Sequence, residues 1–281
     1  MSATTLVSNN RTPTAPVAHV RVQPVTMRRV LVSEWIKLRS LRSTRITLLV
    51  AFLLMTAVGI LYSAVTVNQW STMSAGDKAS FDPTLAALRG HMFAQLAVGV
   101  LGVLVVSGEY ATGMIRASLT AVPKRLPVLW AKSLVFGAVT LVTMTIASLI
   151  AFFGSQSVLT SQNLQTTISA SGVLRSVLGA GLYLTLVGLI GVALGALMRN
   201  TAGAISTLLG TLLLLPVMID LFPSSIRSDI SQYLPSNAGE ALLSPHQQVG
   251  YLAPWTGFAV MCAYAAAALI GAAFVLKRRD A

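Results

Sequence analysis

Six long apolar runs restrict the possible folds of this chain more than any other feature. They cover residues 46–67, 92–107, 128–153, 177–198, 202–221 and 255–276. A helix needs about 20 apolar residues to cross the hydrocarbon core of a bilayer, and only 10% of this chain is charged. Ala, Leu and Gly dominate the runs without strand-like alternation, which favours helices over a β-barrel. We therefore predict an all-α polytopic membrane protein with six transmembrane helices, of which the second is the shortest.

The basic residues predict how the helices are oriented. If the chain crosses the membrane six times, sixteen of its Lys and Arg residues fall on the side of the termini and four on the other side. Short cytoplasmic loops retain Lys and Arg, so both termini are expected in the cytoplasm. The net charge of +12 then reflects topology and attraction to anionic lipid. No soluble basic domain is present, and we expect no nucleic-acid partner.

The first 45 residues divide into two segments. Residues 1–26 are rich in Thr, Pro and Val without an apolar core, which predicts a disordered cytoplasmic tail. Residues 27–45 carry apolar side chains at helical spacing among bases, which predicts an amphipathic interface helix. Its candidate contact residues are Leu31, Glu34, Trp35, Lys37, Leu38, Arg39 and Arg42. A plain lipid anchor is the alternative, but Glu34 favours pairing with a protein partner or a neighbouring base.

Residues 108–127, with the sequence GEYATGMIRASLTAVPKRLP, form a short polar segment between two apolar runs. The charge distribution places this segment in the cytoplasm, and its spacing is compatible with a helix. Its candidate contact residues are Glu109, Tyr110, Gly113, Arg116, Lys124 and Arg125. Glu109 has several possible partners: Arg116, a base of the interface helix, a second protein, or the dipole of its own helix. The segment is therefore predicted to be a cytoplasmic connector that another molecule contacts.

Two further features leave alternatives open. The segment 223–254 contains four prolines separated by short apolar pieces, and it is either an external loop or a re-entrant element that protein covers. Gly188, Gly191 and Gly195 in the fourth run allow close helix packing. We expect these glycines to pack within one chain rather than between two chains.

The sequence lacks the usual signatures of catalysis. It has no G-x-x-x-x-G-K-[ST] phosphate loop, and its three histidines form no metal-binding motif. The single cysteine excludes an internal disulfide. Lys132 and Asp220 lie near the ends of their runs, where they are expected to cap or to reach the headgroups. We predict no catalytic, cofactor-binding or metal-binding residues, and hence no enzyme activity.

Two short motifs carry a resemblance to a known family. The pattern S-E-W-x-K-L-R-S-x-R-S-T spans 33–44, and G-E-Y-x-T-G-x-I-R spans 108–116. Together with the order of the six runs, they resemble the permease subunits of bacterial ATP-binding cassette transporters of the type 2 exporter family. The resemblance covers nearly the whole chain beyond residue 27. One departure is Met114, where the family usually has Thr.

The resemblance implies a function and partners. It implies an interface helix at 27–45, a coupling helix within 108–127 that contacts a separate ATPase chain, and re-entrant helices in 223–254. The expected setting is the bacterial plasma membrane, with a second permease chain and lipid as further partners and ATP bound by the ATPase. The apolar runs weakly favour an amphipathic or lipid-like cargo. A stand-alone secondary carrier and a membrane scaffold are the alternatives, although the two halves show no convincing repeat.

Overall fold

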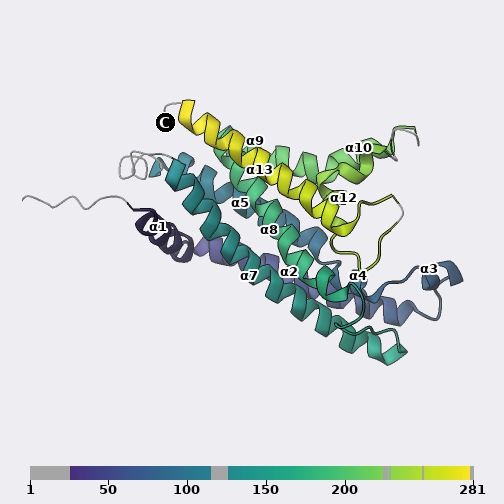
Figure 1. Ribbon diagram of the computed structural model, residues 1–281. Coiled ribbons are helices and arrows are strands. Elements are labelled where there is room, and N and C mark those ends of the chain that lie inside the picture. The colour runs from purple at the N-terminus through teal and green to yellow at the C-terminus, as the bar shows by residue number, and fades with distance from the viewer. Residues whose placement is uncertain (1–25, 115–125, 224–226, 228, 249, 279–281) are drawn as a thin grey trace, which may run out of the picture.

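The fold is seen in a computed structural model that describes residues 26–114, 126–223, 227, 229–248 and 250–278 (Figure 1). Most of the predicted tail and the candidate residues Arg116, Lys124 and Arg125 lie outside the described residues. Within the described part, every regular element is a helix, and six stretches are long and apolar enough to cross a membrane. The prediction of an all-α, multi-pass membrane protein is therefore confirmed.

The helices follow the order of the apolar runs. The candidate spans are α2 (Arg42–Gln69), α4 (Pro83–Leu88) continued by α5 (His91–Ala111), α7 (Leu126–Leu159), α8 (Val173–Met198), α9 (Thr201–Leu209) continued by η2 (Gly210–Leu214) and α10 (Leu215–Asp220), and α13 (Pro254–Arg278). The other elements are α1 (Met27–Ser40), α3 (Ala75–Ala79), η1 (Thr160–Gln162), η3 (Ser231–Tyr233) and α12 (Pro235–Glu240). Several helices extend beyond the predicted runs, because a helix can continue into polar sequence where its side chains find partners or water.

The N-terminal helix ends earlier than predicted. Leu41 has an extended backbone, with φ −74° and ψ 116°, and it separates α1 from α2. The predicted interface helix of 27–45 is therefore interrupted, and Arg42 is the first residue of the first span. This break allows α1 to lie across the end of the bundle while α2 runs along it (Figure 1).

The centre of the bundle is formed by α5 and α8. The most apolar window of α8 is 67% buried and that of the α4–α5 span is 61% buried, against 17% for the span from Thr201 to Asp220. A Cβ atom added to Gly191 would lie 2.3 Å from the carbonyl oxygen of Gly99, so these two helices need glycine to approach so closely. Gly188 lies against Phe136 of α7 and Val98 of α5, and Gly191 and Gly195 lie against α5 at Gly99 and Val103.

The fifth span contains a π-helical segment at Gly210–Leu214, which ends two residues before Pro216. Proline has no N–H group, and its ring clashes with the carbonyl group four residues earlier in an α-helix. Wider π-turns occur mostly as single-turn bulges of this kind. The span therefore continues past Pro216 to Asp220 with a local change of helix type.

The segment 223–254 packs against the bundle through α12. A Cβ atom on Gly239 would lie 2.1 Å from the ring of Tyr183, and one on Gly257 would lie 2.3 Å from the carbonyl oxygen of Ala238. Tyr183 is roughly 15 Å along α8 from its first residue, at the usual rise of a helix. This part of the segment thus lies beside α8 and α13 rather than beyond their ends (Figure 1).

Candidate functional site

The helix α1 lies against α7 through one face. Val30 is buried against Val128 and Ala131 of α7, and Leu38 packs against the main core. Glu34 lies between them on the same face and is only 4% exposed. Residues 30, 34 and 38 are spaced by four, so they form one stripe of the helix. A carboxylate at the centre of an apolar stripe requires a partner inside the protein.

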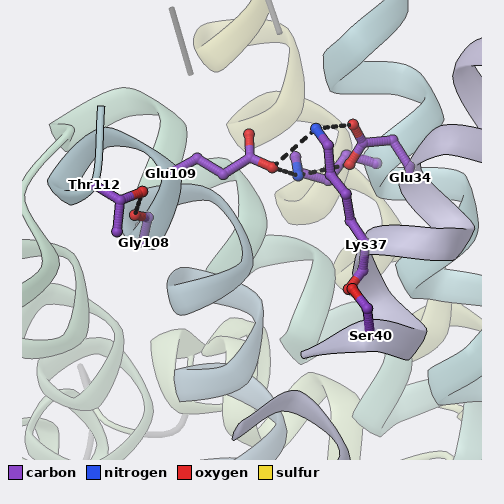
Figure 2. A network of polar contacts seen from close by, with 7 residues as sticks. Glu34, Lys37, Ser40, Gly108, Glu109 and Thr112 are labelled. Atoms are coloured by element: carbon purple, nitrogen blue, oxygen red, sulfur yellow. Dashed lines mark hydrogen bonds and ion pairs between the residues drawn. The ribbon is translucent and has the colours of Figure 1, made fainter. Parts of the chain in front are cut away.

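That partner is part of a cluster of four charged side chains from three helices (Figure 2). The Lys132 ammonium of α7 donates to Glu34 Oε2 at 2.7 Å and to Glu109 Oε1 at 2.8 Å. The Lys37 ammonium of α1 donates to Glu34 Oε1 at 2.7 Å and to Glu109 Oε1 at 3.2 Å. Glu109 belongs to the last turn of α5. We call these four residues the ion quartet.

The ion quartet is balanced in charge and is largely removed from water. The side chains of Glu34, Lys132 and Glu109 are 5%, 6% and 7% exposed, while that of Lys37 is 24% exposed. Burying ions is costly, and the cost is recovered only with close opposite charges and hydrogen bonds. Two carboxylates and two ammonium groups meet that condition. The quartet therefore fixes the relative positions of α1, α5 and α7.

The ordinary pKa of Lys37 is shifted by this environment. Burial lowers the pKa of its ammonium group, but the hydrogen bond to Glu34 and the negative charge of Glu109 raise it more. The resulting pKa lies above the usual 10.5. Lys37 is therefore charged throughout the physiological pH range.

One acceptor of the ion quartet is unused. Glu109 Oε2 is buried and accepts no hydrogen bond from any described residue. Buried acceptors without a donor are rare, because they lose their hydration without replacement. The carboxylate of Glu109 is therefore the least satisfied member of the quartet.

The helix α5 extends further than predicted, and this changes the place of the first connector residues. It continues through Glu109 and Tyr110 to Ala111, so residues 108–111 belong to the second span. Thr112 then caps the helix, with its hydroxyl donating to the Gly108 carbonyl at 2.9 Å. Gly113 has φ +73°, a left-handed conformation that commonly ends helices at glycine. The connector thus leaves the bundle one turn later than the sequence indicated.

Further contacts hold the other side of the end of α5. The Arg199 guanidinium, at the end of α8, lies 5.3 Å from the ring centre of Tyr110. Thr201 Oγ1 at the start of α9 donates to Ser107 Oγ at 2.9 Å. Together with the ion quartet, these contacts join the last turn of α5 to α1, α7 and the α8–α9 junction. A movement of this turn would act on all of them.

The structure brings together some predicted residues and not others. Glu34, Lys37 and Glu109 meet in the ion quartet, so Glu109 pairs with a base of α1, one of the predicted alternatives. Leu31 is partly buried beside the α1–α7 contact. Trp35, Arg39 and Arg42 lie on the exposed side, and Trp35 is 46% exposed. Trp35 therefore lies outside the buried stripe, which is centred on Glu34.

Sequence reasoning missed Lys132 as the centre of the site. Its place near the start of the third run suggested a side chain that reaches the headgroups, but it points into the protein and is 5% exposed. A signal was present: this lysine is followed by a long uncharged run, and two acids, Glu34 and Glu109, lie on the same predicted side of the membrane. Pairing a buried lysine with such acids relieves the cost of all three charges.

Another polar cluster lies at the opposite end of α5. His91 Nδ1 lies 2.8 Å from the Leu88 carbonyl oxygen, and His91 Nε2 lies 3.4 Å from Glu240 Oε1 of the α12 helix. The hydroxyl of Tyr183 donates to Gln95 Oε1. The His91–Glu240 contact joins α12 to α5, and the Tyr183–Gln95 bond joins α8 to α5. Gly239 of α12 also lies against the ring of Tyr183, so the segment stays beside the spans.

Comparison with known proteins does not identify a family for this chain. No protein-family model matches the chain, and a search of curated proteins found no match.

Proposed function

We propose that this chain is the membrane-spanning permease subunit of an ATP-binding cassette exporter. A separate ATPase supplies the energy, and two permease chains enclose the translocation path in the bacterial plasma membrane. Two features of the sequence support the proposal: the resemblance of its motifs at 33–44 and 108–116, and the absence of its own phosphate loop. The six candidate spans provide the membrane domain that such a subunit requires.

The observation that carries the proposal is the ion quartet. It joins the amphipathic helix α1 to the two spans that flank the connector, through Glu109 of α5 and Lys132 of α7. A connector that an ATPase pushes needs a rigid attachment to the bundle, because a flexible one would absorb the movement. Buried, charge-balanced contacts provide such an attachment. Movement of the connector would then be transmitted to α1, α5 and α7 together.

A secondary carrier would use the quartet differently. Carriers often keep ionisable groups near the middle of the membrane, at the substrate site. Here the charged cluster lies at the end of α5 and near the start of α7. This position favours transmission of movement over transport of a coupling ion. A scaffold would need no such attachment between an interface helix and a connector.

The proposal is tested by purifying the tagged chain from its native membrane and measuring ATP hydrolysis in the purified complex. An ATPase chain with a phosphate loop should co-purify, and its reading frame is expected beside that of the permease. The double reversal Lys124→Glu/Arg125→Glu should remove the ATPase while the six-span chain remains in the membrane. Lys78→Glu, on the opposite predicted side, is the matched control and should retain it. Full retention of the ATPase after the double reversal would contradict the coupling role of the connector.

A further inference from the structure

A pocket of about 360 Å³ lies between α1, α2, α5 and α7 beside the ion quartet. Its walls are mainly apolar and include Leu38 of α1, Leu101, Leu104 and Val105 of α5, and Val135 of α7. All four quartet residues border it. Its volume falls within the range of small-molecule sites, which are usually apolar with a few polar groups.

We propose that this pocket binds a neutral amphiphile: an apolar chain or ring system with a hydroxyl group as its hydrogen-bond donor. A fatty alcohol and the hydroxyl end of a neutral glycerolipid share this chemistry. The inference does not depend on the exporter proposal, because binding can be measured without an ATPase. It rests on the pocket, the charge balance of the quartet and one unused acceptor.

The polar end of the pocket lacks a donor rather than a charge. Lys37 and Lys132 already donate to carboxylate oxygens, and the two positive charges equal the two negative ones. A cationic or anionic ligand would leave an uncompensated charge at a largely buried site, which is unfavourable. Glu109 Oε2 still needs a donor, and a hydroxyl group supplies one without adding charge.

The carboxylate of Glu109 can present this oxygen to the pocket. Oε2 is buried without a ligand, and both ammonium groups bind Oε1. The terminal torsion of glutamate has a broad energy profile, so the carboxylate can turn to bring Oε2 to the pocket that Glu109 borders. The ligand's hydroxyl would then donate to Oε2, and its apolar part would lie along Leu101, Leu104 and Leu38. The polar and apolar halves of the pocket thus match the two halves of one amphiphile.

Gly108 provides a way to block the pocket without disturbing the fold. It borders the pocket, and a Cβ atom added there would meet no atom of the described residues within 4 Å. A leucine side chain at this position would extend into the space that the ligand needs. Gly210 is a matched control, because it is also a helical glycine with open space around its Cβ position, and it does not border the pocket.

The test is photolabelling of the full-length chain in lipid nanodiscs with diazirine derivatives of decanol, decylamine and decanoate. The decanol probe should label residues of α2 and α5 in a saturable manner, and unlabelled decanol should compete. The Gly108→Leu variant should label about tenfold less, the factor expected when about two ligand methylenes lose their burial. The Gly210→Leu variant should label like the wild type.

Two results would overturn the proposal. One is labelling of Gly108→Leu equal to that of the wild type, and the other is equal saturable labelling by all three probes. If Gly108→Leu fails to fold, as judged by its thermal unfolding, Leu104→Trp serves in its place, because Leu104 borders the pocket and is 39% exposed. Labelling of Leu104→Trp equal to the wild type would likewise reject the site.

Discussion

Replacing Lys132 by methionine should destabilise the protein strongly, because Lys132 is the central cation of the ion quartet. Its ammonium group is the shared partner of Glu34 Oε2 and Glu109 Oε1, at 2.7 and 2.8 Å. Methionine has a similar length but no charge, so two buried carboxylates would remain with Lys37 alone. Removing one partner of a buried ion pair costs about 3–5 kcal/mol. For a chain of this size, that loss corresponds to a thermal midpoint roughly 6–10 °C lower.

A second variant separates the charge effect from simple loss of packing. In Lys132→Met/Glu34→Gln, the remaining pair of Lys37 and Glu109 is balanced again. The double variant should recover about 1–3 kcal/mol of the loss, the usual coupling between residues in direct contact. Lys78→Met, in helix α3, is the control: its ammonium group lies 5.8 Å from the ring centre of Trp70, and losing this contact should change stability by less than about 1 kcal/mol.

The assay combines thermal unfolding of the detergent-solubilised protein with hydrogen exchange of residues 27–40. Heating rates are kept equal, because membrane proteins often unfold irreversibly and the midpoint then depends on the scan rate. Loss of the quartet should increase hydrogen exchange more in α1 than in α8, since α8 has its own buried contacts. Unchanged exchange in α1, or a double variant no more stable than Lys132→Met, would refute the role assigned to the quartet.

Three further perturbations test local features. Gly172→Ala should lower the free energy of unfolding by about 2 kcal/mol or more, because Gly172 has φ +80° and an added Cβ would lie 2.2 Å from the carbonyl oxygen of Pro245. Gly76→Ala, where the nearest atom to the added Cβ is 3.9 Å away, is the control in the same unfolding assay. Gly113→Ala should lower the free energy of unfolding by about 1 kcal/mol through its left-handed backbone alone, since none of the described residues lies within 4 Å of the added Cβ. A loss above that of Gly172→Ala would contradict this view. The raised pKa of Lys37 implies that its contribution to stability is complete below about pH 10 and is lost as pH rises through the raised pKa. Spin-label distances between α1 and α7 should therefore stay constant until strongly alkaline pH. An increase near neutral pH would argue against the ion pairs of Lys37 with Glu34 and Glu109.

Much of the fold could be predicted because membrane spans leave a strong signal. Apolar runs reveal their number and order, and the charge distribution predicts their orientation. The ends of the spans were less predictable. The second run was taken to stop before Glu109, but a charge that is paired inside the protein does not end a helix, and α5 continues to Ala111.

The candidate site was only partly predictable for a related reason. Glu34 and Glu109 were singled out because acids are rare in this chain, and Lys37 was a candidate of the interface helix. Lys132, the common partner of the two acids, was not singled out. Which cation meets them depends on how α1, α5 and α7 pack, and helical periodicity within one segment does not contain that information. The extended backbone of Leu41, which lets α1 turn across the bundle, likewise has no glycine or proline to mark it.

The most direct test of the central claim is photo-crosslinking from the connector in intact cells. A photoreactive amino acid replaces Arg125 in one variant and Lys78, on the opposite predicted side, in another. We predict that the position of Arg125 crosslinks to a soluble chain that binds ATP and that the position of Lys78 does not. If no ATP-binding protein crosslinks to the position of Arg125 or to any neighbouring position within 108–127, while the chain is inserted and folded, the proposed coupling to an ATPase is contradicted.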